Sequence, residues 1–171
     1  MRDLPADALV IGLGGNVGGE PVIIERFRRA RDALGQLGAV ASAPLYRTAP
    51  IGPDQPAFLN TAVRIRLEDA IPGEVIETVL ELERLLGRNR ATEEHWGPRK
   101  IDLDVLLWGT RVIHTLELEV PHPRLAERRF VLRPLIELFG EDLVVPGTNE
   151  TLAALERGVI EQSVELIAST W

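Results

Sequence analysis

The chain has 171 residues, enough for one domain with a sizeable core, at 45% hydrophobic and 26% charged residues. No apolar run approaches the roughly 18 residues of a membrane-spanning helix. The net charge of -7 argues against a general binder of nucleic-acid backbones, and the lack of cysteine excludes disulfides, thiolate metal sites and cysteine nucleophiles. Acidic residues precede the first apolar stretch, unlike a secretory signal, so we expect a cytoplasmic protein.

The first half of the sequence alternates between predicted strands and helices. Residues 8–13 (ALVIGL) form a short apolar strand, which the glycines of GLGGNVGG end. A helix covers residues 21–37, where apolar side chains recur at helical spacing after a proline suited to the first turn. Residues 40–46 are extended, and the following TAPIGPDQP is a rigid loop. Residues 61–68 alternate between apolar and charged side chains, which predicts a strand with one solvated, positively charged face.

The second half begins with a helix from Pro72 to Gly87, a glycine suited to a left-handed cap. The polar stretch RNRATEEHWGPR lacks periodicity and is interpreted as a mobile loop before an apolar strand at residues 101–108. RVIHT is expected to form a short hairpin with that strand, since WGTR supplies a turn. Further helices are predicted over residues 130–138 and from Asn149, which would cap the last one.

The order of these elements predicts the fold class. Strand, helix, strand, strand, helix, strand is the split βαβ arrangement. We therefore expect an α+β fold, with helices on one face of a mainly antiparallel sheet and extra helices towards the C-terminus. No repeat or low-complexity segment divides the chain, so residues 1–171 are expected to form a single domain.

Two carboxylates interrupt the apolar strand in WGPRKIDLDVLLW. In an extended strand Asp102 and Asp104 project to the same face, about 6 to 7 Å apart, while residues 101, 103, 105 and 107 point into the core. Unpaired, the two charges repel, so a positive group must lie near them. One interpretation is a pair of cross-strand salt bridges to Arg64 and Arg66. The other is a site for hard divalent cations, typically Mg2+ together with substrate phosphates.

The residues around these aspartates favour the second interpretation. Arg88, Arg90 and Arg99 flank the polar loop that runs into the strand. Guanidinium groups suit the oxygens of a polyphosphate. Metal ions together with arginines indicate phosphoryl chemistry.

Three other stretches carry candidate site residues. GLGGNVGG lacks the third glycine of a dinucleotide fingerprint and the lysine of a P-loop, so we favour a tight turn in which Asn16 orders neighbouring loops. His122 is held between two prolines; such a histidine is usually structural, but here it could face a phosphate. Phe58 and Asn60 follow the rigid loop. Phe58 could simply fill the core beside a polar neighbour; alternatively, Phe58 stacks on a flat heterocycle and Asn60 forms hydrogen bonds to its edge.

Three long stretches in this order resemble a known family: YRTAPIGPDQPAFLNTAV, HWGPRKIDLDVLL and VPHPRLAERRFVLRPL. They are similar to the signature stretches of the 6-hydroxymethyl-7,8-dihydropterin pyrophosphokinases of the folate pathway. The resemblance spans about residues 8 to 140 by the order of the motifs.

This resemblance implies a ferredoxin-like core, two Mg2+ ions, and ATP and hydroxymethyl-dihydropterin as substrates. The positions of the metal ligands are Asp102 and Asp104. The pterin is expected between two aromatic residues, and the positions that line its pocket are Thr48, Ile51, Phe58, Asn60 and Phe130. The positions that contact ATP are Glu83, Arg90, Arg99, His122 and Arg128. The positions that assist transfer are Arg88 and Arg99, beside the two aspartates.

The sequence departs from the family pattern at three places. The loop from Arg88 to Trp96 is one residue longer than in common members and carries two glutamates. Glu117 and Glu119 stand where some members place basic or hydroxyl residues towards the nucleotide, so the affinity for ATP is expected to differ. Gly15 replaces a frequent serine, a change expected to be mild.

The implied reaction is in-line attack of the pterin hydroxyl on the β-phosphorus of ATP, with AMP as the leaving group. We expect a monomer that binds no nucleic acid and no membrane. Two other classes share the order of elements: an RNA-binding module, disfavoured by the -7 charge and 5% aromatic residues, and a small-ligand regulatory domain, which would have no use for paired aspartates.

Overall fold

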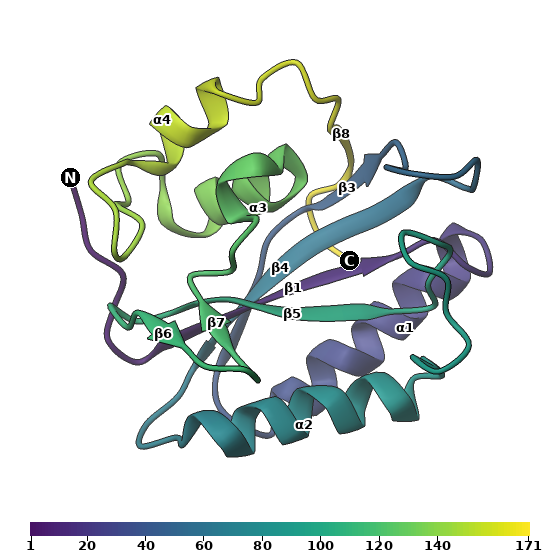
Figure 1. Cartoon of the computed structure of the whole chain (residues 1–171), viewed down its shortest axis with the longest axis horizontal. Coiled ribbons are helices and arrows are strands. Elements are labelled where there is room, and N and C mark those ends of the chain that lie inside the picture. Colours follow the sequence, from purple (N-terminus) through teal and green to yellow (C-terminus); the bar gives the residue numbers. More distant parts are fainter.

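A six-stranded sheet separates two layers of helices (Figure 1). The structure is a computed structural model that describes residues 1–171. The strand order is β5-β1-β4-β3-β8, β2 also pairs with β4, and all pairings are antiparallel. The six strands are β1 (Ala8–Gly15), β2 (Val40–Ser42), β3 (Leu45–Thr48), β4 (Phe58–Arg66), β5 (Asp102–Trp108) and β8 (Glu165–Ala168). No helix combines the length and the apolar character that crossing a membrane requires.

Helices α1 (Glu20–Leu34) and α2 (Pro72–Leu85) cover one face of the sheet. Their buried apolar side chains recur at helical spacing and pack with the strands into a core of 22 buried residues. With these helices, the order β5-β1-β4-β3 is that of a split βαβ unit. The predicted ferredoxin-like core and mainly antiparallel sheet are therefore confirmed.

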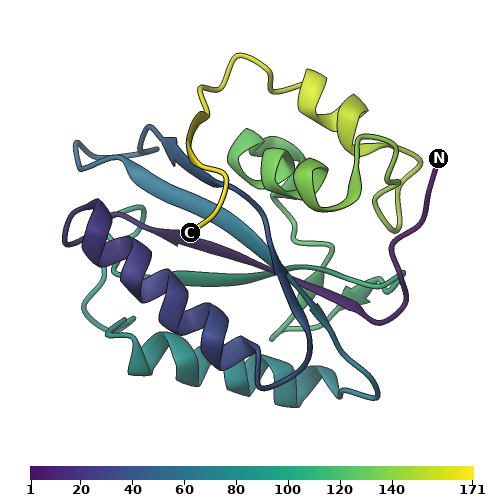
Figure 2. The same cartoon turned by 180° about the vertical axis from the view of Figure 1, so that it is seen from behind.

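The opposite face of the sheet is covered by the later part of the chain. Helices α3 (Arg129–Phe139) and α4 (Leu152–Arg157) pack there over a second core of 16 buried residues, as the view from behind also shows (Figure 2). Ala62 of β4 lies in this core with 1% of its surface exposed, and the Arg64 guanidinium stacks over the Phe139 ring. The predicted solvated face of residues 61–68 is confirmed for Arg66 and Glu68, which are exposed, but is wrong for the part around Arg64, which a distant helix covers.

Two short elements precede α3. Strands β6 (Ile113–His114) and β7 (Glu119–Val120) form a separate two-stranded hairpin, so the prediction that RVIHT pairs with β5 is wrong. The 3-10 helix η1 (Leu125–Glu127) follows. The last helix begins later than expected: the side chain of Thr151, not Asn149, caps α4 by accepting a hydrogen bond from the Ala154 N–H.

The strands β1 and β5 differ from the predictions at one end each. Strand β1 continues through Gly15, where an added Cβ would lie 2.7 Å from the Lys100 carbonyl oxygen, so only glycine permits this close approach. The pairing of β1 with β5 shifts between Val10 and Ile11, so that Leu107 belongs to the core under α3 while residues 101, 103 and 105 belong to the core under α1 and α2. The prediction that Leu107 shares their face is wrong for this reason.

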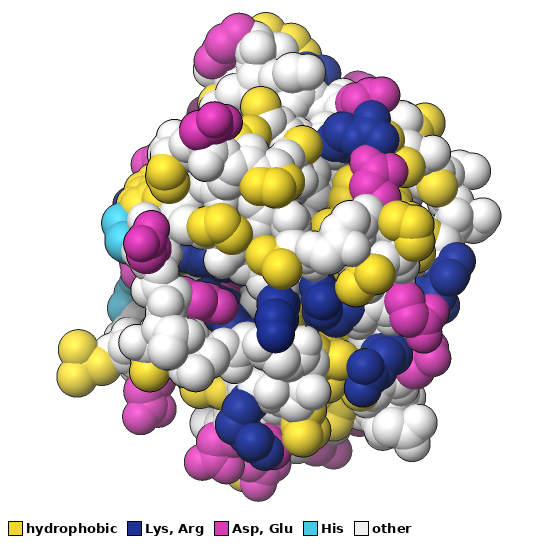
Figure 3. Space-filling model, turned by 90° about the vertical axis from the view of Figure 1, so that its right-hand side faces the viewer, with side chains coloured by type: hydrophobic (Ala, Val, Ile, Leu, Met, Phe, Trp, Pro, Cys, Tyr) yellow, Lys and Arg dark blue, Asp and Glu magenta, His cyan; other side chains and the backbone are white.

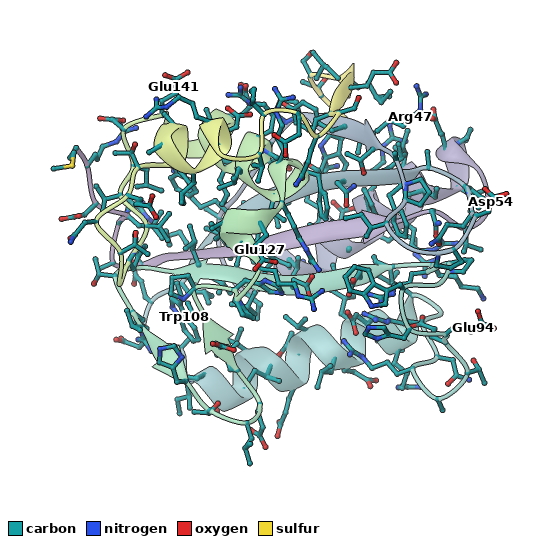
Figure 4. The ribbon with its side chains drawn as sticks, turned by 45° about the horizontal axis from the view of Figure 1, so that its top comes forward. Arg47, Asp54, Glu94, Trp108, Glu127 and Glu141 are labelled. Atoms are coloured by element: carbon teal, nitrogen blue, oxygen red, sulfur yellow. The ribbon has the colours of Figure 1, made fainter.

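Three segments lie over the sheet along β5. The loop of residues 49–57 and the loop of residues 86–101 meet at the end where β5 begins and where Figure 4 labels Asp54 and Glu94, while Trp108 marks the opposite end of β5. The segment of residues 121–129, which follows β7, meets β5 farther along, where the His122 N–H donates to the Leu106 carbonyl (2.9 Å). Figure 3 views the side of the molecule where β5 begins, where Lys and Arg side chains, in dark blue, lie in the middle of the face.

Candidate active site

A cavity opens between the sheet and these three segments. It brings together nine of the thirteen residues singled out in the sequence, from β3, β4, β5, α3 and the loops: Thr48, Ile51, Phe58, Asn60, Arg99, Asp102, Asp104, Arg128 and Phe130. Glycines 12 and 14 of β1 form part of its floor. A Cβ at Gly14 would lie 3.0 Å from the Asn60 Oδ1, so glycine keeps this floor open.

Asp102 is held by two arginines of the 86–101 loop. Its Oδ1 accepts a hydrogen bond from Arg88 Nη1 (2.5 Å) and its Oδ2 accepts one from Arg99 Nη1 (2.7 Å). Burial alone would raise the pKa of Asp102, but the charges of Arg88 and Arg99 outweigh it and hold that pKa below its ordinary value. The alternative of cross-strand pairs with Arg64 and Arg66 is wrong for this carboxylate.

Asp104 lies on the same face of β5 without such a partner. Burial, followed by the charges of Asp102 and Glu83, raises its pKa to about 7, and the positive charges of Arg128 and Arg88 only partly offset this. The carboxylate faces the cavity among negative neighbours. A cation beside it would remove this electrostatic penalty.

Glu83 of α2 lies beneath the aspartates with 1% of its surface exposed. Its Oε1 accepts hydrogen bonds from Arg88 Nη1 (2.7 Å) and from the Leu103 N–H (2.8 Å). Its Oε2 accepts one from Arg90 Nη2 (2.7 Å). Both oxygens are thus engaged by the chain, and they tie α2 to the one residue that separates Asp102 from Asp104.

Arg88 is the buried centre of an ion-pair network. Besides Asp102 and Glu83 it contacts Glu93, whose Oε2 accepts a hydrogen bond from Arg88 Nε (2.9 Å). Burial would lower its pKa, but these carboxylates raise it, so the guanidinium stays charged. Glu93 belongs to the loop from Arg88 to Trp96, and it supplies the third acid.

Asn16 joins three loops by its side chain. Its Nδ2 donates to Gln55 Oε1 (3.0 Å) and to the Pro56 carbonyl (2.9 Å), and its Oδ1 accepts from the Arg99 N–H (2.8 Å). Its own N–H donates to the Arg99 carbonyl (2.9 Å). The interpretation of the glycine run as a tight turn in which Asn16 orders neighbouring loops is therefore confirmed, and the backbone of Arg99 is fixed on both sides.

One part of the cavity suits a flat polar ring. Phe58 enters it from β4 and Phe130 from the first turn of α3, so the two aromatic residues come from different layers of the fold. Asn60 Nδ2 donates to Thr48 Oγ1 (2.7 Å), which leaves the Asn60 Oδ1 to accept a hydrogen bond from a ligand.

A second cavity lies on the other side of Asp104. Apolar residues of α2 and β5 line it, and its polar residues are Arg90, Asp104, Thr115, Glu117, Glu119 and His122. His122 Nδ1 accepts a hydrogen bond from the Arg124 N–H (3.1 Å), so in the neutral ring Nε2 carries the proton and is a donor. Burial and then the charge of Arg128 lower the pKa of His122, which favours this neutral form. Since Asp104 lines both cavities, molecules bound in each would meet at the two aspartates.

Eleven of the 20 residues that line the first cavity were not predicted from the sequence, among them Arg124 and Trp96. Arg124 places its guanidinium 4.8 Å from the centroid of the Trp96 ring, and both side chains line the cavity. Arg124 lies in PHPRLAERRF, between His122 and Arg128. The cluster of basic residues beside a histidine in this stretch is the sequence signal that could have identified Arg124 as a site residue.

Comparison with known proteins places these residues in a family. The model of the 7,8-dihydro-6-hydroxymethylpterin-pyrophosphokinase family matches residues 10–140. A 2-amino-4-hydroxy-6-hydroxymethyldihydropteridine pyrophosphokinase of Synechocystis sp. is 37% identical over 152 residues, covering 85% of this chain and 73% of that protein. The protein of the same name from Bacillus subtilis is 43% identical over 132 residues, which are 75% of each chain.

A solved structure shows the same fold at low sequence identity. The wild-type HPPK-DHPS of Plasmodium falciparum, solved with pteroate, matches 94% of this chain with a TM-score of 0.69 and 14% identity. This chain spans 43% of that longer protein. At this identity the likeness concerns the fold alone.

Proposed function

The chain belongs to the 7,8-dihydro-6-hydroxymethylpterin-pyrophosphokinase family, and from this we propose its reaction. It transfers the β,γ-diphosphate of ATP to the hydroxymethyl group of 6-hydroxymethyl-7,8-dihydropterin, giving the pterin diphosphate and AMP. The observation that carries the proposal is the position of Asp104, which lines both a cavity with two aromatic residues and a second one beside His122. Two substrates can thus meet at one pair of carboxylates.

The first cavity supports binding of the pterin. Phe58 and Phe130 would stack on its two faces, and aromatic contacts of this kind are sensitive to ring geometry. Asn60 Oδ1 would accept a hydrogen bond from an N–H of the ring edge, since its Nδ2 is held by Thr48. Ile51 and Thr48 would close the remaining wall. The hydroxymethyl group then points towards Asp102 and Asp104.

The residues present fit the divalent cations that the family implies. No three His, Asp or Glu side chains are placed to hold an ion by themselves, but Mg2+ typically uses one or two carboxylates and completes its shell with water and phosphate. Asp102 and Asp104 would hold it, and the raised pKa of Asp104 is the penalty that such a charge relieves. When bound, the cations neutralise phosphate charge and lower the pKa of the attacking hydroxyl. We propose that two such ions bind.

The arginines and His122 would position the polyphosphate. Arg99 and Arg128 line the first cavity, whereas Arg90 and His122 line the second, so donors face the junction from both sides. Guanidinium groups stabilise charge that develops on the transferred group. Arg88 lines neither cavity and would act from beneath, through Asp102. Glu83 is proposed to hold these groups in place and not to touch ATP.

Activity as a monomer, expected from the sequence, is likewise part of the proposal. The cytoplasmic location expected from the sequence remains part of the proposal.

The test is to incubate the purified chain with ATP, Mg2+ and the hydroxymethyl-dihydropterin and to identify products by mass spectrometry. We expect AMP and the pterin diphosphate. ADP as the nucleotide product would contradict diphosphate transfer, and binding of both compounds without turnover would favour a small-ligand regulatory domain. Asp7→Asn, in the exposed pair with Arg66, is a control that should retain full activity.

A further inference from the structure

Arg124 is a cation of the first cavity that no carboxylate pairs with. Arg88, Arg90 and Arg99 each form an ion pair with Glu83 or Asp102, whereas the contact of the Arg124 guanidinium is the face of the Trp96 ring, at 4.8 Å. A guanidinium at this distance is attracted by the ring quadrupole and also packs flat on it. The partner of this arginine is therefore an aromatic side chain of the 86–101 loop.

Trp96 is the point at which the two loops over the cavity meet. Its carbonyl oxygen accepts a hydrogen bond from Gln55 Nε2 (2.7 Å) in the 49–57 loop. Its φ of 64° is one that L-residues rarely adopt, so the surroundings must hold it. At Gly52 an added Cβ would lie 2.9 Å from the Trp96 Cβ, which requires glycine there. Trp96 thus contacts the opposite loop through its Cβ and carbonyl oxygen and Arg124 through its ring.

The segment that carries Arg124 is fixed to the sheet. The His122 N–H donates to the carbonyl of Leu106 in β5 (2.9 Å), and the Leu125 N–H donates to the His122 carbonyl (3.0 Å). The Arg124 N–H is itself bonded to His122 Nδ1 (3.1 Å). The guanidinium is therefore presented from a rigid support, while its partner belongs to a loop without regular structure.

We propose that Arg124 is a positioning residue that holds Trp96, and with it the 86–101 loop, over the first cavity. The inference rests on the proposed function, because the covered cavity is the one assigned to the pterin. Through this loop Arg124 acts on Arg99, which reaches Asp102 from the same segment.

The expected size of the effect follows from the strength of such a contact for an exposed arginine, which corresponds to about 2- to 5-fold in the equilibrium between a closed and an open loop. In Arg124→Ala the KM of the pterin should rise by this factor. The kcat should change by less than about 2-fold, because bound substrates still favour the closed loop. Arg124→Lys keeps the charge but not the planar stack, so its KM should lie between those of the wild type and Arg124→Ala.

The decisive experiment is a double-mutant cycle between Arg124 and Trp96. If Arg124 acts through the indole, Arg124→Ala should have no further effect on KM in the Trp96→Ala background. An equal rise in KM in both backgrounds would mean that Arg124 touches the substrate directly and would overturn the proposal. Arg111→Ala is the matched control: this guanidinium stacks 4.5 Å from the Trp108 ring at the far end of β5, where Figure 4 labels Trp108, and its loss should leave KM unchanged.

Hydrogen exchange of the chain alone gives a readout that needs no activity. The amides of Gly97 and Arg99, which donate to the Glu94 carbonyl and to Asn16 Oδ1, should exchange about 2- to 5-fold faster in Arg124→Ala than in the wild type, and at the wild-type rate in Arg111→Ala. Unchanged exchange in Arg124→Ala would overturn the proposal that Arg124 holds the 86–101 loop, even if the enzyme is active. Faster exchange in a chain that forms no AMP would support the role of Arg124 and refute the proposed function.

Discussion

Arg88 Nη1 donates to Asp102 Oδ1 over 2.5 Å, so a carboxylate proposed to hold a cation is also the partner of a buried guanidinium. A divalent cation at Asp102 competes with this arginine and with Arg99 for the same two oxygens. The displaced Arg99 guanidinium would lie beside the bound polyphosphate, which offers new acceptors, whereas Arg88 would keep Glu83 and Glu93 as partners. Cation binding and the release of Arg99 towards the phosphates are therefore expected to be coupled.

Asp102→Asn tests the role of this carboxylate. The amide keeps the shape of the side chain but removes the charge, so turnover should fall by about 100-fold or more. The fold should survive, because Arg88 retains Glu83 and Glu93 as partners. Steady-state kinetics and circular dichroism measure the two effects. A folded variant with near-normal rates would contradict the assignment of Asp102 as a metal ligand.

Glu83→Ala should be far more damaging to stability than Glu83→Gln. Alanine leaves the buried Arg88 with one acid fewer and the Leu103 N–H without an acceptor, at a cost of about 3 kcal/mol in the free energy of unfolding. Glutamine keeps an oxygen in the place of Oε1. Urea denaturation of the two variants makes the comparison. Equal stabilities would show that the carboxylate does not hold α2 against β5.

Asp104→Asn should stabilise the fold at pH 8, by up to about 4 kcal/mol, because it removes a carboxylate whose pKa is raised from 3.8 to about 7. Burial, then the charges of Asp102 and Glu83, cause this shift. Since the folded chain holds the proton more tightly than the unfolded chain, the contribution of Asp104 to stability is complete below pH 4 and is lost as the pH rises through 7.

The advantage of Asp104→Asn should accordingly be largest at pH 8 and should disappear near pH 4. Denaturation with EDTA present, at pH 8, 6 and 4.5, follows this trend, while turnover should be lost at every pH. A variant no more stable than the wild type at pH 8 would show that the carboxylate carries no electrostatic penalty.

Asn16→Ala should loosen the loops without unfolding the core. It removes two donors and one acceptor that join Gln55, Pro56 and Arg99, so kcat/KM should fall by about 10-fold or more. Asn16→Asp keeps the acceptor for the Arg99 N–H but sets a buried carboxylate against the Pro56 carbonyl, so it should lose at least as much. Limited proteolysis should cut the 49–57 and 86–101 loops of Asn16→Ala faster than those of the wild type, at similar melting temperatures. Wild-type proteolysis rates would argue against this role.

The sequence predicted the common face of Asp102 and Asp104, because the two-residue period of a strand holds over those positions. The same period failed for Leu107, since a shift in pairing with β1 changes the face, and alternation within one strand does not reveal its neighbour's register. The partial burial of the second face of β4 was also missed. Around Arg64 this face is covered by α3, more than sixty residues later in the chain, whereas Arg66 on the same face is exposed as predicted.

The partners of the charged residues were the least predictable part of the site. Spacing suggested Arg64 and Arg66 for Asp102, whereas the loop folds back to supply Arg88 and Arg99. Which acid pairs with which base depends on how a loop without periodicity closes over the sheet, and no local pattern encodes this. The role of Asn16 was predictable, because a polar amide in a glycine turn has few partners other than adjacent loops.

The bond from the Leu103 N–H to Glu83 also affects how the molecule behaves in a crowded solution. Strand β5 is an edge of the sheet, and free backbone groups on an edge invite strands of other molecules to pair with them. Here the outward N–H of Leu103 donates to Glu83 Oε1, and the carbonyl of Leu106 accepts a hydrogen bond from the His122 N–H. Glu83, which supports β5 from α2, thus also reduces the tendency of this edge strand to pair with other molecules and aggregate.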